Sequence, residues 1–198
     1  DGSFIVTSNK GTKIHASVVA IAGGLGSFEP RKPLIDGINF YEDKGVKYFI
    51  KNPEKFRDKR VVIAGGGDSA LDWSIFLSNI ASEVTLVHRR NEFRGALDSV
   101  EKVQELKNSG KIKLITPAEV VGLNGAEHIE SIDLDENGAH RKIACDYFIP
   151  LFGLTPKLGP IGNWGLEIEK NAIKVKNALD YQTNIPGIFA IGDVNTYP

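Results

Sequence analysis

The sequence predicts an α/β fold built around a parallel sheet. Two apolar, β-branched stretches, 60–64 and 83–87, have the composition of buried strands. Three consecutive glycines and a helical pattern separate them, so the order is strand, tight turn, helix and strand. This order is typical of a βαβ unit, whose strands lie parallel and whose crossover is right-handed.

The composition limits the class of protein. The chain has 198 residues, 41% of them hydrophobic and 25% charged, which is enough apolar material for one or two cores. Its formal net charge is -1, so we expect neither nucleic acid nor an acidic membrane as a partner. A single cysteine and the lack of a long apolar run predict a cytoplasmic protein. Because the chain contains no methionine, even at position 1, we expect it to be part of a longer protein.

For the N-terminal segment, residues 1–33, the sequence predicts strands followed by a crossing between structural units. Apolar and polar residues alternate on both sides of Asn9-Lys10-Gly11, which predicts a hairpin. The apolar run 18–22 predicts a buried strand. Glycines and prolines within 23–33 exclude a helix, so we expect a domain boundary there.

The central segment, residues 34–158, contains the βαβ unit and the elements that extend it. We expect one helix from Ala70 to about Asn79 and another over 97–108, before Gly110. The other apolar stretches predict a strand over 112–115, an antiparallel hairpin of 129–134 with 142–149 around Glu136-Asn137-Gly138, and a buried strand over 147–152.

From residue 157 onward the sequence predicts a second crossing and a few short strands. Residues 157–165 are irregular and rich in glycine and proline. A short hairpin is expected around Lys170-Asn171, followed by a strand over 187–191 that Gly192-Asp193 ends.

A glycine motif, Gly65-x-Gly67-x-x-Ala70, lies between the first strand of the βαβ unit and its helix. Alone, such a motif can be a simple strand-to-helix turn, but in this position it is typical of a dinucleotide-binding loop. Gly65 permits the tight turn, Gly67 leaves room for a pyrophosphate, and Ala70 allows the helix and strand to pack closely.

The other residues of this loop, Gly66, Asp68 and Ser69, are also expected at the cofactor. Free N–H groups at the start of the helix face its phosphates, and the helix dipole adds a favourable potential. A carboxylate so close to a phosphate is unusual, so we assign Asp68 to helix capping or to contacts with water.

Basic residues follow the second strand. An enzyme that uses NAD usually has Asp or Glu there, about 20 residues past the glycines, to bind the ribose 2′-hydroxyl. This chain has His88-Arg89-Arg90 instead, and Arg94 follows. Guanidinium groups bind a 2′-phosphate that a carboxylate would repel, so NADP(H) is the favoured cofactor. The alternatives are a solvated basic patch for the arginines and a packing role for His88.

Four segments of the chain resemble the flavoprotein reductases that have two dinucleotide-binding domains. These segments are residues 65–73, 84–94, 158–171 and 192–197. Two branches compete: low-molecular-weight thioredoxin reductases and the thioredoxin-reductase-like ferredoxin/flavodoxin-NADP reductases. The former carry Cys-x-x-Cys just upstream of the glycine motif, where this chain has residues 45–53 without a cysteine. Cys145 alone cannot form a dithiol, so the second branch is the closer resemblance.

This resemblance implies a Rossmann-like NADP-binding domain, residues 34–158, inserted in parts of an FAD-binding domain, residues 1–33 and 159–198. It also implies that Asp193 and Phe28 lie at the flavin. Asp193 could instead be an ordinary turn residue, and Phe28 a core aromatic. Gly153, after the strand 147–152, is a further candidate for cofactor binding.

The implied activity is electron transfer from NADPH through FAD to ferredoxin or flavodoxin, by an enzyme for which a homodimer is allowed but not required. The cofactors carry the bond chemistry, so we expect no catalytic side chain and no metal ligand. The chain lacks an earlier glycine motif for FAD. We therefore expect it to bind NADP(H), to hold FAD weakly or not at all, and to be inactive alone. A thioredoxin-reductase-type or other NADPH-dependent flavin reductase and a non-catalytic NADP(H)-binding module are the alternatives.

Overall fold

The computed structural model describes residues 2–24, 27–177 and 179–196, apart from the side chains of Ser27, Phe28 and Pro156. Two compact units divide the chain: unit 1 is Asp1–Glu29 with Leu154–Pro198, and unit 2 is Pro30–Gly153. The division falls within the first expected crossing and a few residues before the second. Which cofactor belongs to which unit stays a prediction.

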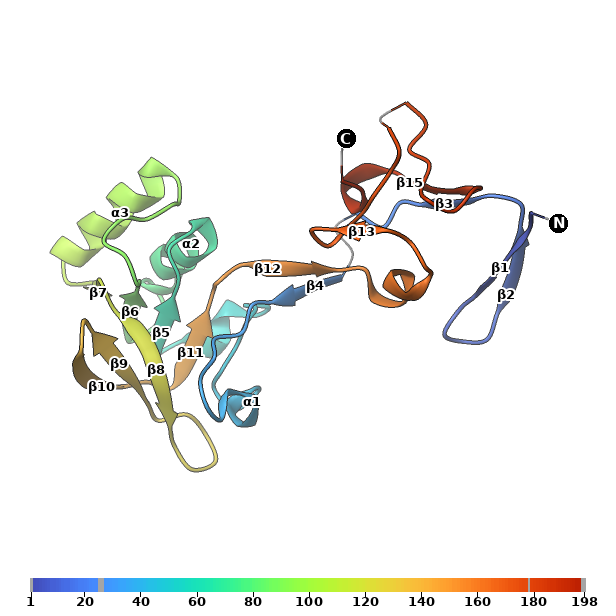
Figure 1. Cartoon of the computed structure of the whole chain (residues 1–198). Coiled ribbons are helices and arrows are strands. Elements are labelled where there is room, and N and C mark those ends of the chain that lie inside the picture. The colour runs from blue at the N-terminus through green and yellow to red at the C-terminus, as the bar shows by residue number, and fades with distance from the viewer. Residues whose placement is uncertain (1, 25–26, 178, 197–198) are drawn as a thin grey trace. The chain divides into compact units, whose positions relative to one another are not determined.

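Unit 2 is built on a parallel sheet in the order β11-β5-β6-β7 (Figure 1). Two helices connect its strands, and neither these nor any other helix in the described residues is long and apolar enough to span a membrane. The α/β prediction is confirmed, and β6, β7 and α3 have the predicted bounds. The elements are β11 (Tyr147–Pro150), β5 (Arg60–Ala64), α2 (Asp68–Leu77), β6 (Glu83–Val87), α3 (Leu97–Asn108) and β7 (Ile112–Ile115).

Alternate residues of the central strand β5 enter two different cores. Val61 and Ile63 pack with apolar side chains of α2 and α3. Val62 and Ala64 point to the other face, where they join a second core. Because both faces of the sheet are covered, β5 is apolar and buried from Val61 to Ala64.

An antiparallel sheet of β8 (Glu119–Asn124), β9 (Ser131–Glu136) and β10 (Ala139–Ala144) supplies that second core. The β9–β10 hairpin confirms the predicted turn. The predicted strand 142–149 is wrong, because Cys145 and Asp146 separate β10 from β11, which joins the parallel sheet instead. Strand β8 was not expected, since its pattern is interrupted at Gly122, where the register with β9 shifts.

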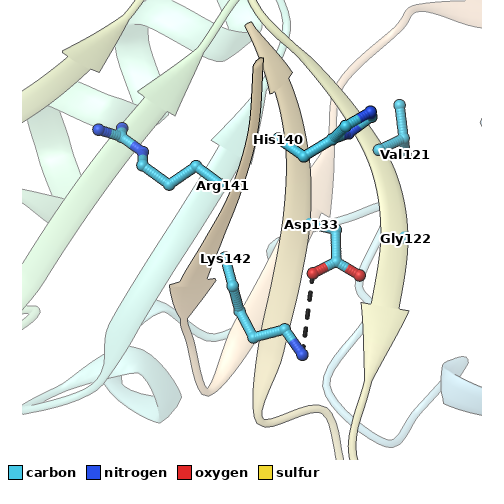
Figure 2. A pocket seen from close by; sticks show the side chains of 6 residues that line it. All are labelled: Val121, Gly122, Asp133, His140, Arg141 and Lys142. Atoms are coloured by element: carbon cyan, nitrogen blue, oxygen red, sulfur yellow. Dashed lines mark ion pairs between the residues drawn. The ribbon is translucent and has the colours of Figure 1, made fainter. Parts of the chain in front are cut away.

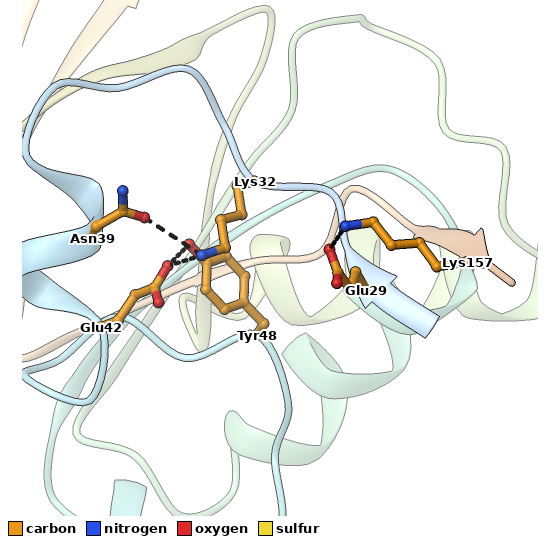
Figure 3. A network of polar contacts seen from close by, with 6 residues as sticks. All are labelled: Glu29, Lys32, Asn39, Glu42, Tyr48 and Lys157. Atoms are coloured by element: carbon orange, nitrogen blue, oxygen red, sulfur yellow. Dashed lines mark hydrogen bonds and ion pairs between the residues drawn. The ribbon is translucent and has the colours of Figure 1, made fainter. Parts of the chain in front are cut away.

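Polar contacts fix the short connections of unit 2, which include α1 (Ile38–Tyr41) and η1 (Pro53–Phe56). Asp146 accepts hydrogen bonds from the backbone N of Arg60 at 2.8 Å and from its Nη2 at 2.7 Å, and this guanidinium lowers the pKa of the carboxyl. Glu42 accepts from Lys32 at 2.5 Å and from the Tyr48 hydroxyl at 3.1 Å (Figure 3).

Unit 1 consists of small strand pairs around its own core. The N-terminal hairpin and the one at Lys170-Asn171 are confirmed, and β15 lies parallel to β3. The predicted buried strand 18–22 is shorter than expected: Val18 is 57% exposed, and of this run only Ile21 is buried. Glu29 and Lys157 form an ion pair between β4 and β12 (Figure 3). The elements are β1 (Phe4–Thr7), β2 (Lys13–Ala16), β3 (Val19–Ile21), β4 (Ser27–Pro30), β12 (Leu154–Lys157), η2 (Gly159–Asn163), β13 (Ile168–Glu169), β14 (Ala172–Ile173), β15 (Ile188–Ala190) and η3 (Gly192–Val194).

Candidate functional site

Three segments with predicted cofactor residues leave the parallel sheet of unit 2 at the same edge. Ala64 of β5 pairs with Val87 of β6 and with Pro150 of β11, so the ends of these strands lie level. The glycine loop, residues 65–69, follows β5, and the arginine loop, residues 88–96, follows β6. Gly153 comes shortly after β11. Open α/β sheets bind their ligands at this edge.

The glycine loop presents open space and amide donors. A Cβ atom at Gly67 would meet no other atom within 4 Å. None of the described residues accepts a hydrogen bond from the backbone N–H of Gly66, Gly67 or Ser69. Helix α2 begins at Asp68, so these donors lie at its positive end. The loop therefore fits a phosphate group.

Gly65 is required by close packing and not by the backbone angles of the turn. Its φ is not positive, so the turn does not need a left-handed residue at this position. A Cβ atom there would lie 2.7 Å from the carbonyl oxygen of Leu151 and 2.8 Å from the Cβ of Ala70. Ala70 is fully buried, as its packing role requires.

His88 packs the arginine loop against the glycine loop. Its buried ring stacks on Phe93 at a centroid distance of 5.2 Å, and Nε2 lies 3.2 Å from the carbonyl oxygen of Glu92. A Cβ atom at Gly66 would lie only 2.1 Å from the His88 Cε1, so the ring covers this glycine. Burial lowers the pKa of His88 and the neighbouring arginines lower it further, against the opposing effect of the Glu92 carbonyl. The ring is therefore neutral at pH 7.

Arg89, Arg90 and Arg94 are exposed on the arginine loop. Within the part of the chain that the structure describes, none of the three guanidinium groups pairs with a carboxylate. The backbone N–H of Arg94 donates to the carbonyl oxygen of Gly66 at 2.7 Å, which joins the two loops directly. This juxtaposition favours an anion with several phosphates over the alternative of a merely solvated basic patch.

Asp68 holds the arginine loop and does not cap its own helix. Its Oδ1 accepts a hydrogen bond from the backbone N–H of Ala96 at 2.7 Å. The N-cap of α2 is Gly67, and no side chain caps this end. The predicted capping role is therefore wrong. Sequence reasoning missed the contact because donor and acceptor are 28 residues apart and a backbone amide leaves no mark in the sequence.

The remaining candidates belong to neither of the two loops. Gly153 has a φ of 89°, and its carbonyl accepts a hydrogen bond from the Arg31 backbone N–H at 3.0 Å. Asp193 is exposed in η3 of unit 1, directly after β15. Phe28 belongs to β4 of unit 1, and its side chain lies outside the described residues. The structure thus brings together the glycine and arginine loops, whereas Asp193 and Phe28 belong to the other unit.

A cavity of about 440 Å³ lies away from these loops, on the antiparallel sheet of unit 2 (Figure 2). Asp133 forms an ion pair with Lys142 at 3.9 Å and accepts a hydrogen bond from the side-chain amide of Asn124 at 2.8 Å, so both of its carboxylate oxygens already have partners. Over the described residues, no group of His, Cys, Asp and Glu could hold a metal ion. The cavity is lined by Val121, Gly122, Asp133, His140, Arg141 and Lys142.

Cys145 is buried in the core of unit 2 and is not a surface nucleophile. Its exposed fraction is 0%, and burial raises the pKa of its thiol to about 12. We expect a maleimide to modify the folded protein at least roughly a hundredfold more slowly than the urea-unfolded chain. Mass spectrometry of timed samples measures both rates, and equal rates would contradict the burial.

Known proteins of the same family and of similar structure match the whole or nearly the whole of this chain. The model of the pyridine nucleotide-disulphide oxidoreductase family matches residues 2–198. A ferredoxin–NADP reductase of Flavobacterium johnsoniae is 89% identical over 198 residues, and one of Bradyrhizobium sp. is 46% identical over 200. Both alignments cover 100% of this chain but only 57% and 58% of the relatives' length. The crystal structure of Lactococcus lactis thioredoxin reductase has a TM-score of 0.79 and 26% identity, and the match covers 100% of this chain and 63% of that one.

Proposed function

The chain belongs to the pyridine nucleotide-disulphide oxidoreductase family, and we propose that it is the NADPH-binding portion of a flavoprotein that passes electrons from NADPH through FAD to ferredoxin or flavodoxin. The curated relatives named ferredoxin–NADP reductase support this reaction class. Because the chain spans little more than half their length, the activity, FAD and the electron acceptor are proposals for the longer protein.

The observation that carries the proposal is the pairing of an open glycine loop with three guanidinium groups. The amides around Gly67 suit the pyrophosphate of a dinucleotide. Arg89, Arg90 and Arg94 suit a 2′-phosphate, which NADP(H) has and NAD(H) lacks. We assign the cofactor contacts to Gly65–Gly67, Ser69, Ala70 and these arginines, with His88 beneath them and Gly153 at the same edge of the sheet.

We assign Asp193 and Phe28 of unit 1 to the flavin side of the longer protein. When bound, NADPH would supply a hydride to FAD, and the reduced flavin would pass on the two electrons one at a time and release the proton to solvent. We further propose that the protein works in the cytoplasm; a homodimer is compatible with this function and not required by it.

Two alternative functions differ from this one in the thiols or in the electron transfer that they require. A thioredoxin-reductase-type enzyme needs two redox-active thiols, and this chain has the single buried Cys145. A non-catalytic NADP(H)-binding module would share the whole nucleotide site. Ferredoxin reduction by the full-length protein separates these possibilities: ferredoxin-dependent NADPH oxidation supports the reductase, and its absence favours the others.

The first test concerns the coenzyme alone. In calorimetric titrations of this chain, we expect NADPH to bind at least on the order of tenfold more tightly than NADH, because charge-assisted hydrogen bonds contribute roughly 1.5–3 kcal/mol each. Equal affinity for the two coenzymes would overturn the proposed function.

A further inference from the structure

We infer that Asp68 is a positioning residue, whose carboxylate holds the arginine loop in the place where it recognises the 2′-phosphate. This inference rests on the proposed function. Asp68 is the first residue of α2, and its Oδ1 accepts the backbone N–H of Ala96, the N-cap residue of α3, at 2.7 Å. The side chain of Asp68 thus links the start of α2 to the end of the arginine loop.

The link completes a missing cap on α3. Ala96 has no side chain that could accept a hydrogen bond at this helix start. In a capping box, an acidic side chain of the same helix accepts the N–H of the N-cap residue. Here Asp68 provides that acceptor from a neighbouring helix, so the beginning of α3 and the position of the arginine loop depend on α2.

The surrounding contacts show that the link leaves little freedom. A Cβ atom at Gly95 would lie 2.5 Å from Leu71 Cδ1 and 3.1 Å from the Asp68 Oδ1, so a side chain at this position would have to displace the buried Leu71 or the loop. The N–H of the preceding residue, Arg94, donates to Gly66 at 2.7 Å. Two hydrogen bonds, one from the residue on each side of Gly95, therefore fix the backbone that carries Arg94.

The acidic charge itself is not needed for this role. A carboxylate at the start of α2 is unfavourable for an anion bound there, whereas an amide oxygen accepts the same hydrogen bond without a charge. Asp68→Asn should therefore keep the arginine loop in place, and Asp68→Ala should release it. This difference separates positioning from direct contact with the cofactor.

A second acid on the same helix provides the matched control. Asp72 lies one turn further along α2 and accepts a hydrogen bond from Ser99 of α3 at 2.9 Å. Asp72→Ala also removes one acidic residue and one contact between α2 and α3, but it leaves the arginine loop attached. Its effect reports the general cost of weakening this helix pair.

The experiment compares NADPH and NADH affinities of the three variants with those of the unchanged chain. We expect Asp68→Ala to weaken NADPH binding on the order of tenfold and NADH binding less than about twofold. Asp68→Asn and Asp72→Ala should keep the preference for NADPH. A folded Asp68→Ala protein with the original preference would overturn the inference, and so would an Asp68→Asn protein that loses it. An unchanged chain that does not distinguish the coenzymes would instead overturn the proposed function.

Amide hydrogen exchange tests the link without any coenzyme. We expect Asp68→Ala to accelerate exchange at Ala96 and Arg94 at least on the order of tenfold relative to Asp72→Ala, because the two hydrogen bonds open together. Unchanged exchange at Ala96 would contradict the link itself. If Asp68→Ala does not fold, Gly95→Ala displaces the same loop, and it should weaken NADPH binding while sparing NADH; equal losses would overturn the inference.

Discussion

Replacing Arg89 and Arg90 together by alanine is expected to weaken NADPH binding roughly a hundredfold or more and to change NADH binding less than about twofold. Each charge-assisted hydrogen bond contributes roughly 1.5–3 kcal/mol, so either single variant should lose about tenfold. Both side chains are exposed at the end of β6 and, among the described residues, have no carboxylate partner. No internal ion pair has to break before they bind a phosphate. Calorimetric titration with both coenzymes measures the effect.

Arg57→Ala is the control for the arginine variants. Arg57 is also exposed in unit 2, but its Nε lies 2.7 Å from Glu54 in η1, and it belongs to neither loop. We expect its loss to leave the ratio of the two affinities unchanged. If the Arg89 and Arg90 variants weaken NADPH and NADH equally, these side chains attract the coenzyme only through general charge and do not read the 2′-phosphate.

The elements with a strong local pattern could be predicted from the sequence, and those defined by distant partners could not. Strand β6 and helix α3 have the expected bounds because apolar periodicity and a glycine in a left-handed conformation, Gly110, mark them locally. The stretch 142–149 is uniformly compatible with a strand. Only its partners, β9 for the first part and β5 for the second, divide it at Cys145 and Asp146.

The candidate site shows the same limit. The positions of Gly67 and of the arginines follow from residue type and spacing, because phosphate binding needs room and positive charge at the end of a strand. The roles of the other loop residues do not follow from residue type and spacing. Gly66 is required by the ring of His88, and Asp68 is required by the backbone of Ala96. Each contact joins two segments that are separated in the sequence by more than one helix or strand, so no local sequence pattern predicts it.

Gly67→Asp is expected to abolish most binding of both coenzymes while the protein stays folded. The φ of Gly67 is -104° and its ψ is 178°, which any residue can adopt, and a Cβ atom there meets nothing within 4 Å. Asp is also a preferred N-cap residue, so the free energy of unfolding should stay equal or rise by up to about 1 kcal/mol. The new carboxylate lies where we place the pyrophosphate, and repulsion of roughly 3 kcal/mol there weakens binding about a hundredfold.

Gly66→Ala is the opposite case and completes the test of the glycine loop. Its Cβ would lie 2.1 Å from the ring of His88, which is held between Phe93 and the Glu92 carbonyl, so the ring or the loop must move. We expect a loss of about 1–3 kcal/mol in the free energy of unfolding, measured by urea denaturation. Gly67→Asp should thus weaken coenzyme binding and leave the free energy of unfolding at least unchanged. Gly66→Ala should lower the free energy of unfolding. A Gly67→Asp protein that still binds NADH normally would place the pyrophosphate elsewhere, because NADH shares that group with NADPH and lacks only the 2′-phosphate.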